Sequence, residues 1–187
     1  MNLPARFEGD ERVRLFCALR LPPETVEELL AWQRDSFAGV PGIRPVPADN
    51  LHVTLAFLGH QPVAELEAIA GALRETAERA ERPLLALLGY RETRTVGMLT
   101  FDDEDGRAAA LAAGLHERLE ALGVYEPERR RWLPHVTVLR FRERPRLQPV
   151  LPALEPFVTS DAAAYLSRLR PGGAQYEVLE SMAVGGR

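Results

Sequence analysis

Hydrophobic residues along the chain follow two patterns, one typical of strands and the other of helices. The second helical segment, for example, places Leu66, Ile69, Ala70 and Leu73 on one face. The expected helices span residues 22–37, 63–80 and 107–122. The expected strands span residues 12–21, 51–58, 84–91, 93–101, 136–141, 162–169 and 175–184, and the last two form a hairpin around residues 170–173.

The order of these elements, β-α-β-α-β-β-α-β-β-β, predicts an α+β fold with mainly antiparallel sheet. No proline-rich or serine-rich linker divides the 187 residues. A chain of this length buries roughly 70% of the surface that its unfolded form exposes, so it needs no disulfide to fold. We therefore expect residues 1–187 to form a single bilobal domain, with two intimate lobes that share a cleft.

The composition of the chain bears on its cellular compartment and on the role of its cysteine. No apolar run approaches the roughly eighteen residues that span a bilayer. Residues 1–11 are polar and acidic, unlike a signal peptide. We therefore expect a cytoplasmic protein without a membrane partner. Cys17 is the one cysteine and lies in an apolar run, which favours core packing over nucleophilic chemistry.

The charge of the chain is unevenly distributed. A formal net charge of -4 argues against a broad, non-specific nucleic-acid surface. Residues 129–146, however, contain seven arginines and one acid, Glu143. Such a segment can contact phosphates, or it can form a solvated basic edge.

A His-x-Thr motif occurs twice, each time inside an apolar strand. The first copy is His52-Val53-Thr54 and the second is His135-Val136-Thr137. Because side chains alternate along a strand, each histidine shares a face with its threonine while the apolar residues face the core. A single copy carries a modest risk of having arisen by chance. Two copies in matching surroundings, however, predict an internal pseudo-repeat with one motif in each lobe.

The two motifs together suit the hydrolysis of a cyclic phosphodiester. One histidine takes a proton from the attacking water and the other protonates the leaving ribose oxygen, and imidazole titrates near neutral pH. The hydroxyls of Thr54 and Thr137 can donate hydrogen bonds to the phosphate oxygens on which charge builds. Neither step requires a metal or a cofactor.

Around these residues the chain resembles the two-histidine (2H) phosphoesterase superfamily, and most of all the bacterial and archaeal RNA 2′,3′-cyclic phosphodiesterases, historically called 2′-5′ RNA ligases. The resemblance covers nearly the whole chain. Residues 14–19 resemble the opening strand of the family, residues 52–59 its first motif, residues 134–140 its second motif, and residues 167–176 its closing hairpin.

The resemblance implies two mainly antiparallel sheets that face a central cleft, with helices on the outside. It implies a hydrolase that converts 2′,3′-cyclic phosphate ends of RNA, such as those of tRNA halves, to 2′-phosphomonoesters, with reversible 2′-5′ joining as a second activity. His52 would be the proton donor and His135 the proton acceptor. Thr54 and Thr137 would bind the phosphate, and Arg140 would bind the substrate. It implies no metal, no cofactor and no protein partner.

Strict strand alternation raises a question about Arg140 and Phe57. It turns Arg140 away from the face of His135, so this arginine reaches the cleft only if the strand bulges, and otherwise lies at the rim. It also turns Phe57 away from the face of His52. The sequence therefore names no aromatic side chain on which an RNA base would stack.

Three alternatives remain open. The same site can act on another substrate, such as a small cyclic nucleotide, a 2′-5′ oligoadenylate or an ADP-ribose cyclic phosphate. The motifs can also belong to a non-catalytic module that binds RNA ends, or the two histidines can ligate a metal. Four further residues are expected to have packing, surface or structural roles: Trp32, Trp132, His60 and His116.

Overall fold

The α+β fold expected from the sequence is confirmed in the computed structural model, which describes residues 11–128, 130–159, 161–171 and 173–185. The residues before 11, Arg129 of the basic segment and Gly172 of the hairpin turn lie outside the described residues. The helices are α1 (Pro23–Phe37), α2 (Leu66–Arg79) and α3 (Arg107–Ala121), with 3-10 turns at Ala48–Asn50 and Val63–Glu65. No helix within the described residues is long and apolar enough to cross a membrane.

The strands are β1 (Arg12–Arg20), β2 (Ile43–Pro45), β3 (His52–Pro62), β4 (Leu84–Glu92), β5 (Val96–Asp102), β6 (His135–Phe141), β7 (Phe157–Val158), β8 (Asp161–Arg170) and β9 (Gly173–Ala183). They follow the order β7-β4-β5-β6-β3-β1-β8-β9, with β2 paired to β6, and every pairing is antiparallel. The two short strands β2 and β7 are the strands that the sequence did not predict.

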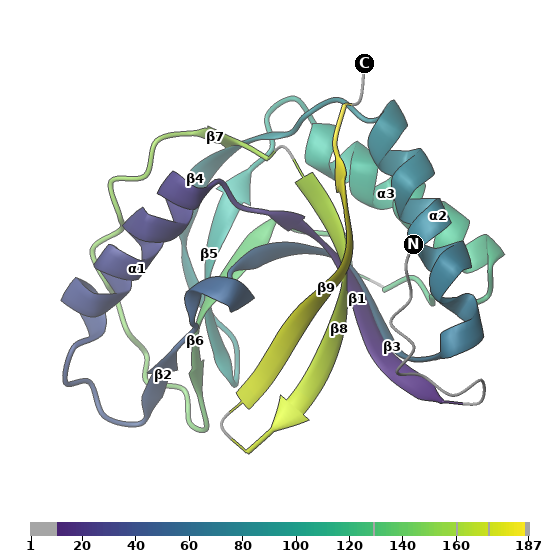
Figure 1. Ribbon diagram of the computed structural model, residues 1–187. Coiled ribbons are helices and arrows are strands. Elements are labelled where there is room, and N and C mark those ends of the chain that lie inside the picture. Colours follow the sequence, from purple (N-terminus) through teal and green to yellow (C-terminus); the bar gives the residue numbers. More distant parts are fainter. Residues whose placement is uncertain (1–10, 129, 160, 172, 186–187) are drawn as a thin grey trace.

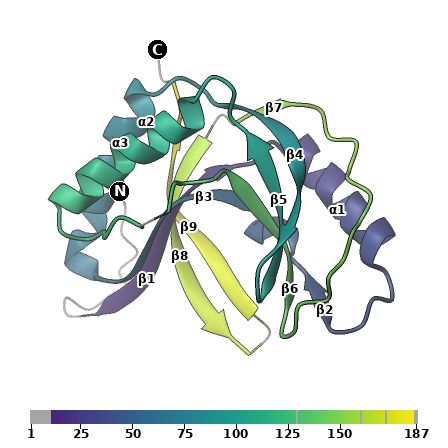
Figure 2. The same cartoon turned by 180° about the vertical axis from the view of Figure 1, so that it is seen from behind.

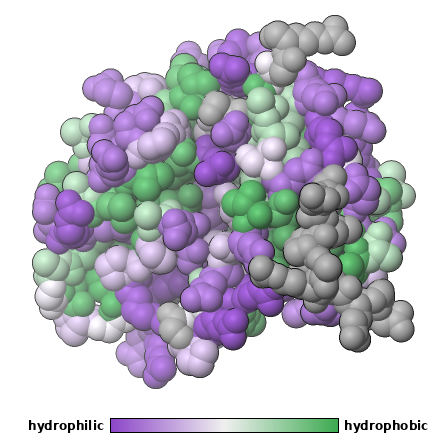
Figure 3. Space-filling view, viewed as in Figure 1, coloured by the Kyte–Doolittle hydropathy of each residue, from purple (hydrophilic) through white to green (hydrophobic). Residues whose placement is uncertain are grey.

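The two halves of this sheet meet at β3 and β6, where Val53 pairs with Val136. The strands that carry the two His-x-Thr motifs are therefore neighbours at the centre of the molecule. Figure 1 shows α1 outside one half and the pair α2 and α3 outside the other, and the reverse view in Figure 2 shows the same division. The hairpin of β8 and β9 projects from the sheet, and the face in Figure 3 carries hydrophilic side chains around the end of this hairpin.

Strand β1 is buried on both faces, which explains its continuous apolar run. On one face, Leu15, Cys17 and Leu19 belong to the main core, which spans both halves of the sheet. On the other face, Phe16 packs against Tyr165 in a second, smaller cluster. Burial raises the pKa of Cys17 to about 12, which agrees with its expected packing role.

A buried glutamate fixes the basic segment that follows β6. The Glu92 side chain is only 3% exposed and forms an ion pair with Arg144 Nε at 3.2 Å. It also accepts hydrogen bonds from the backbone N–H groups of Arg146, at 2.9 Å, and Leu147, at 2.8 Å. These bonds hold Arg146 at a positive φ of 57°, a backbone conformation that arginine rarely adopts.

We expect Glu92→Gln to lower the free energy of unfolding by about 1–3 kcal/mol, because the variant amide removes the charge and presents N–H donors to groups that are themselves donors. Urea unfolding followed by tryptophan fluorescence measures this change. Glu143→Gln, which alters an exposed acid of the same segment, is the matched control. Equal stability of both variants would contradict the anchoring role of Glu92.

Candidate active site

The two His-x-Thr segments share one order of buried and accessible positions. Residues 52–58 and residues 135–141 both begin with a partly exposed histidine, bury the next position, expose the threonine partly, and then bury two positions in succession. The sixth position is exposed in both, and it is Phe57 in β3 and Arg140 in β6. The likeness between the two segments therefore extends beyond the three residues of the motif.

The pairing of β3 with β6 brings the four motif side chains together. Because the strands are antiparallel and Val53 lies opposite Val136, His52 lies across from Thr137 and Thr54 lies across from His135. Val53 and Val136 are fully buried on the opposite face. The four polar side chains therefore converge on the accessible face of the central strands, as the sequence predicted.

A β-bulge brings Arg140 to this same face. Along β6, Thr137 pairs with Met98 and Leu139 with Gly97, so Val138 is an extra residue on its strand. Val138 and Leu139 are both buried, and the alternation resumes with Arg140 exposed. The positive charge of Arg140 acts on His52 and lowers its pKa, which also indicates that the two side chains lie close to one another.

A second bulge places Phe57 on the accessible face, contrary to strict alternation. Cys17 pairs with Ala56 and Ala18 with Thr54, which leaves Leu55 as the extra residue of β3. Phe57 is 45% exposed, and the guanidinium of Arg14 lies 4.5 Å from its ring centroid. The sequence offered one signal for this position, namely that Phe57 and Arg140 each follow their motif histidine by five residues.

Helix side chains donate hydrogen bonds to the carbonyl groups of the two bulged residues, Leu55 and Val138. His116 Nε2 of α3 donates a hydrogen bond to Leu55 O at 2.7 Å. Gln33 Nε2 of α1 donates to Val138 O at 2.7 Å, and the backbone N–H of Val46 reaches the same oxygen at 2.9 Å. His116 thus has the structural role expected of it, and each lobe uses one outer helix to hold its bulge.

The surroundings of His52 are mainly aromatic. Its ring centroid lies 4.9 Å from that of Phe16, 5.9 Å from that of Tyr165 and 5.4 Å from that of Tyr176. Burial lowers the pKa of His52 from 6.5 to about 4, the nearby backbone of Asn50 opposes this change, and the charges of His135 and Arg140 add to it. Nδ1 of His52 has no hydrogen bond of good geometry within the described residues.

His135 is oriented by its own backbone. Its Nδ1 lies 2.9 Å from Leu133 O, and because a carbonyl oxygen only accepts, this nitrogen carries a hydrogen. In the neutral ring, Nε2 is therefore left with a free lone pair. Such a nitrogen can accept a proton from water, which is the chemistry of a general base.

The pH profile of the acid–base chemistry expected from the two histidines should reflect the low pKa of His52. A histidine pair that needs one neutral and one protonated ring gives a bell-shaped profile, whose acid limb follows the lower macroscopic pKa. We expect the acid limb of kcat/KM to have its midpoint near pH 4, because His52 takes up a proton only as the pH falls through that value. Initial rates at low substrate concentration, from pH 3 to pH 9, measure this limb.

Tyr176→Ala tests whether burial causes the low pKa of His52, since the Tyr176 ring packs edge-on against His52. Opening this side to water should raise the pKa of His52 toward 6.5 and move the acid limb up by about one pH unit. A wild-type limb already centred between pH 6 and 7 would show that burial does not control His52.

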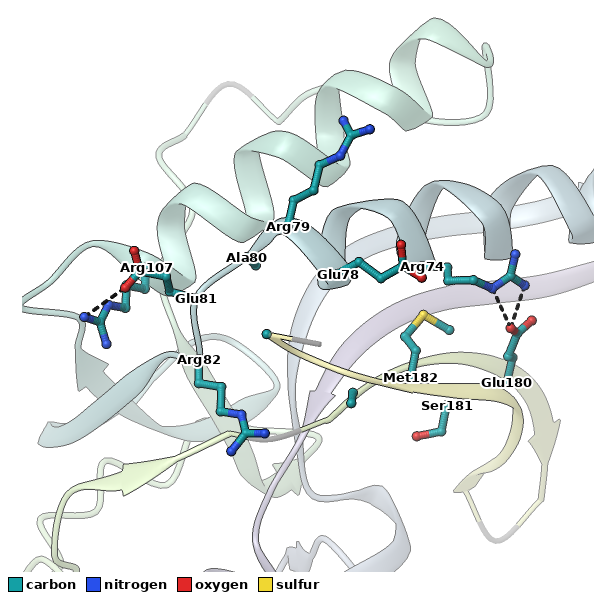
Figure 4. A pocket seen from close by; sticks show the side chains of 12 residues that line it. Arg74, Glu78, Arg79, Ala80, Glu81, Arg82, Arg107, Glu180, Ser181 and Met182 are labelled. Carbon is teal, nitrogen blue, oxygen red and sulfur yellow. Dashed lines mark hydrogen bonds and ion pairs between the residues drawn. The ribbon is translucent and has the colours of Figure 1, made fainter. Parts of the chain in front are cut away.

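One cavity adjoins the motif residues and another lies apart from them. The first, with a volume of 730 Å³, is lined by Thr54, Phe57 and His135 together with residues of β4, β5, α3 and the segment before β6. The second, of 1340 Å³, lies at the end of α2, and two of its arginines pair with glutamates, Arg74 with Glu180 at 2.6 Å and Arg107 with Glu81 at 3.0 Å (Figure 4). Its lining residues include no histidine among those described.

The remaining candidates from the sequence have structural contacts or lie at the surface. Trp32 Nε1 donates to Val150 O at 2.7 Å, and Trp132 Nε1 donates to Thr54 O at 3.0 Å. Trp132 thus ties the segment before β6 to the first motif. His60 is exposed at the far end of β3. In the described part of the chain, no three His, Cys, Asp or Glu side chains are grouped so that they could hold a metal ion.

Comparison with known proteins shows the family of this chain. The family model described as LigT like Phosphoesterase matches residues 19–90. The RNA 2′,3′-cyclic phosphodiesterase of Thermus thermophilus is 34% identical over 184 residues, covering 93% of this chain and 91% of that protein. A crystal structure of a Thermus thermophilus protein has a TM-score of 0.78 at 32% identity and covers 92% of this chain and 98% of its own.

A second solved structure is similar to this chain over nearly its whole length. Escherichia coli LigT complexed with 3′-AMP has a TM-score of 0.77 at 28% identity, and the match covers 93% of this chain and 99% of that one. These similarities extend over the central strands and over the lobes on both sides of them. The chain belongs to the LigT-like phosphoesterase family.

Proposed function

We propose that this protein is an RNA 2′,3′-cyclic phosphodiesterase, which opens 2′,3′-cyclic phosphate ends to 2′-phosphomonoesters. The observation that carries the proposal is the convergence of His52, Thr54, His135 and Thr137 on the accessible face of two paired central strands. The relatives named RNA 2′,3′-cyclic phosphodiesterase, which include the Thermus thermophilus and Escherichia coli proteins, support it.

In this proposal the two histidines divide the proton transfers. His135 accepts a proton from the attacking water, and its hydrogen bond to Leu133 O leaves Nε2 free to do so. His52 donates a proton to the leaving ribose oxygen. Because the pKa of His52 is about 4 in the free protein, this role requires that the bound phosphate anion raise that pKa.

The remaining site residues bind the phosphate and the nucleoside. Thr54 and Thr137 donate hydrogen bonds to the phosphate oxygens, and Arg140 adds a positive charge on the same face. Phe57 offers the aromatic face on which a base stacks.

Residues 1–187 act as one bilobal domain, with one motif in each lobe. The cytoplasmic setting expected from the sequence stays a prediction.

The substrates of this site are proposed in more detail as follows. RNA ends such as those of tRNA halves are the proposed substrates, and reversible 2′-5′ joining is a proposed second activity of the same site. Small cyclic nucleotides and 2′-5′ oligoadenylates remain alternative substrates, because they present the same phosphodiester chemistry to the two histidines. Parallel assays with each substrate separate these possibilities.

Product analysis tests the proposed reaction. Wild-type protein with EDTA is incubated with an RNA oligonucleotide that ends in a 2′,3′-cyclic phosphate, and the product is compared with synthetic 2′-phosphate and 3′-phosphate standards. Conversion to the 2′-phosphate is the expected result. No turnover would favour a non-catalytic module that binds RNA ends, and turnover that needs added metal would favour a metalloenzyme.

A further inference from the structure

The 730 Å³ cavity beside His135 is large enough for a nucleotide in addition to the reacting phosphate, since pockets for small ligands span about 300–1,000 Å³. It extends from Thr54 and His135 toward the end of β4 and the segment before β6. The motif residues occupy only one border of this space. Its other walls are therefore available to parts of a ligand that lie beyond the cyclic phosphate.

Arg91 stands on the same face of the sheet as the motif residues. It pairs with Met98 on β5, and Met98 pairs with Thr137 on β6. Residues directly opposite one another on neighbouring strands face the same side, so Arg91 lies two strands, or about 10 Å, from Thr137. Its side chain is exposed and makes no hydrogen bond or ion pair with any residue that the structure describes.

Arg131 lines the same cavity from the segment before β6. The next residue, Trp132, is fixed by its hydrogen bond to Thr54 O, which anchors this wall to β3. Arg131 is also exposed and has no ion-pair or hydrogen-bond partner in the described part of the chain. Two unpaired guanidinium groups thus border one cavity, and guanidinium is well suited to bind phosphate.

The acidic groups of the cavity are already engaged. Glu92 is nearly buried and is bound by Arg144 and two backbone N–H groups. Glu128 is paired with Arg130 at 2.8 Å. The charge that remains for a ligand is therefore positive, and the ligand is an anion. Phe57, Tyr125 and Trp132 add aromatic walls, a combination typical of sites that bind single-stranded nucleic acid.

We propose that this cavity binds the nucleotide adjoining the cyclic end of an RNA strand, with its phosphodiester held between Arg91 and Arg131. The proposal rests on the phosphodiesterase activity inferred above and adds a substrate class to it. An oligonucleotide reaches both arginines, whereas a mononucleoside 2′,3′-cyclic phosphate has no second phosphate to offer. The protein should therefore prefer oligonucleotide ends over cyclic mononucleotides.

Two substrates and one double variant test this proposal. The ratio of kcat/KM for an adenylate trinucleotide ending in a 2′,3′-cyclic phosphate to that for adenosine 2′,3′-cyclic phosphate is measured at low salt. We expect a ratio of at least about ten for the wild type. Arg91→Gln combined with Arg131→Gln should lower this ratio about tenfold or more, and added salt should lower the wild-type ratio because phosphate contacts are screened.

Arg94→Gln is the matched control, because Arg94 is exposed on the same β4–β5 hairpin but does not line the cavity. It should leave the ratio unchanged. A wild-type ratio near one, an equal loss on both substrates in the double variant, or an equal effect of Arg94→Gln would overturn the proposal. If the wild type turns over neither substrate, the phosphodiesterase proposal itself fails.

Discussion

Replacing either His52 or His135 by alanine should reduce kcat for an RNA 2′,3′-cyclic phosphate end by about 10²–10⁴-fold, the usual contribution of a well-placed general acid or base. Each substitution removes one of the two imidazoles that converge across β3 and β6. Neither ring belongs to the main core, so the variants should remain folded. Single-turnover rates with saturating protein measure the chemical step directly.

His60→Ala is the control for this experiment, since His60 is an exposed histidine on the same strand as His52. It should retain the wild-type rate. Circular dichroism should show that all three variants are folded. Full activity in a folded His52→Ala or His135→Ala protein would remove that residue from the mechanism.

Replacing Thr54 or Thr137 by valine should lower kcat by about 10²–10³-fold, the typical loss of one donor that stabilises developing charge. Valine preserves the branched shape that suits a strand but cannot donate a hydrogen bond. KM should change little, because the charge on the phosphate oxygens is greatest in the transition state. Steady-state kinetics of each variant gives both constants.

Thr95→Val, at the exposed turn between β4 and β5, is the corresponding control and should behave as the wild type. An increase in KM with unchanged kcat would show instead that the hydroxyls hold the ground state and the transition state equally. Loss in one variant only would assign the role to a single threonine.

The main elements of the fold were predictable because their hydrophobic patterns are long and regular. All three helices and seven of the strands correspond to segments expected from the sequence. The strands β2 and β7 were not predicted, because they span only three and two residues. Segments this short show no periodicity, and their pairing partners on β6 and β4 are distant in the sequence.

The faces of Arg140 and Phe57 were not predictable from alternation. Each lies beyond a bulge, and a single extra residue reverses the side on which all later side chains stand. The carbonyl groups of the two bulged residues accept hydrogen bonds from other elements, Leu55 O from His116 and Val138 O from Gln33. These donors reach the strands only when the chain is folded. The local pattern of apolar residues along each strand therefore cannot predict these hydrogen bonds.

The aromatic surroundings of His52 are also a product of distant pairing. Phe16 comes from β1, while Tyr165 and Tyr176 come from the closing hairpin. The sequence shows these residues as ordinary strand positions. Their effect on the pKa of His52 appears only once β1 is paired with both β3 and β8.

The most direct test of the central claim compares the wild type, both single histidine variants and the double variant on one RNA 2′,3′-cyclic phosphate substrate in EDTA. If His52 and His135 act as one acid–base pair, the wild type is fully active, each single variant loses at least about a hundredfold, and the double variant loses little more than the weaker single variant. Multiplicative losses, or a wild type that EDTA inactivates, would contradict a metal-independent histidine pair.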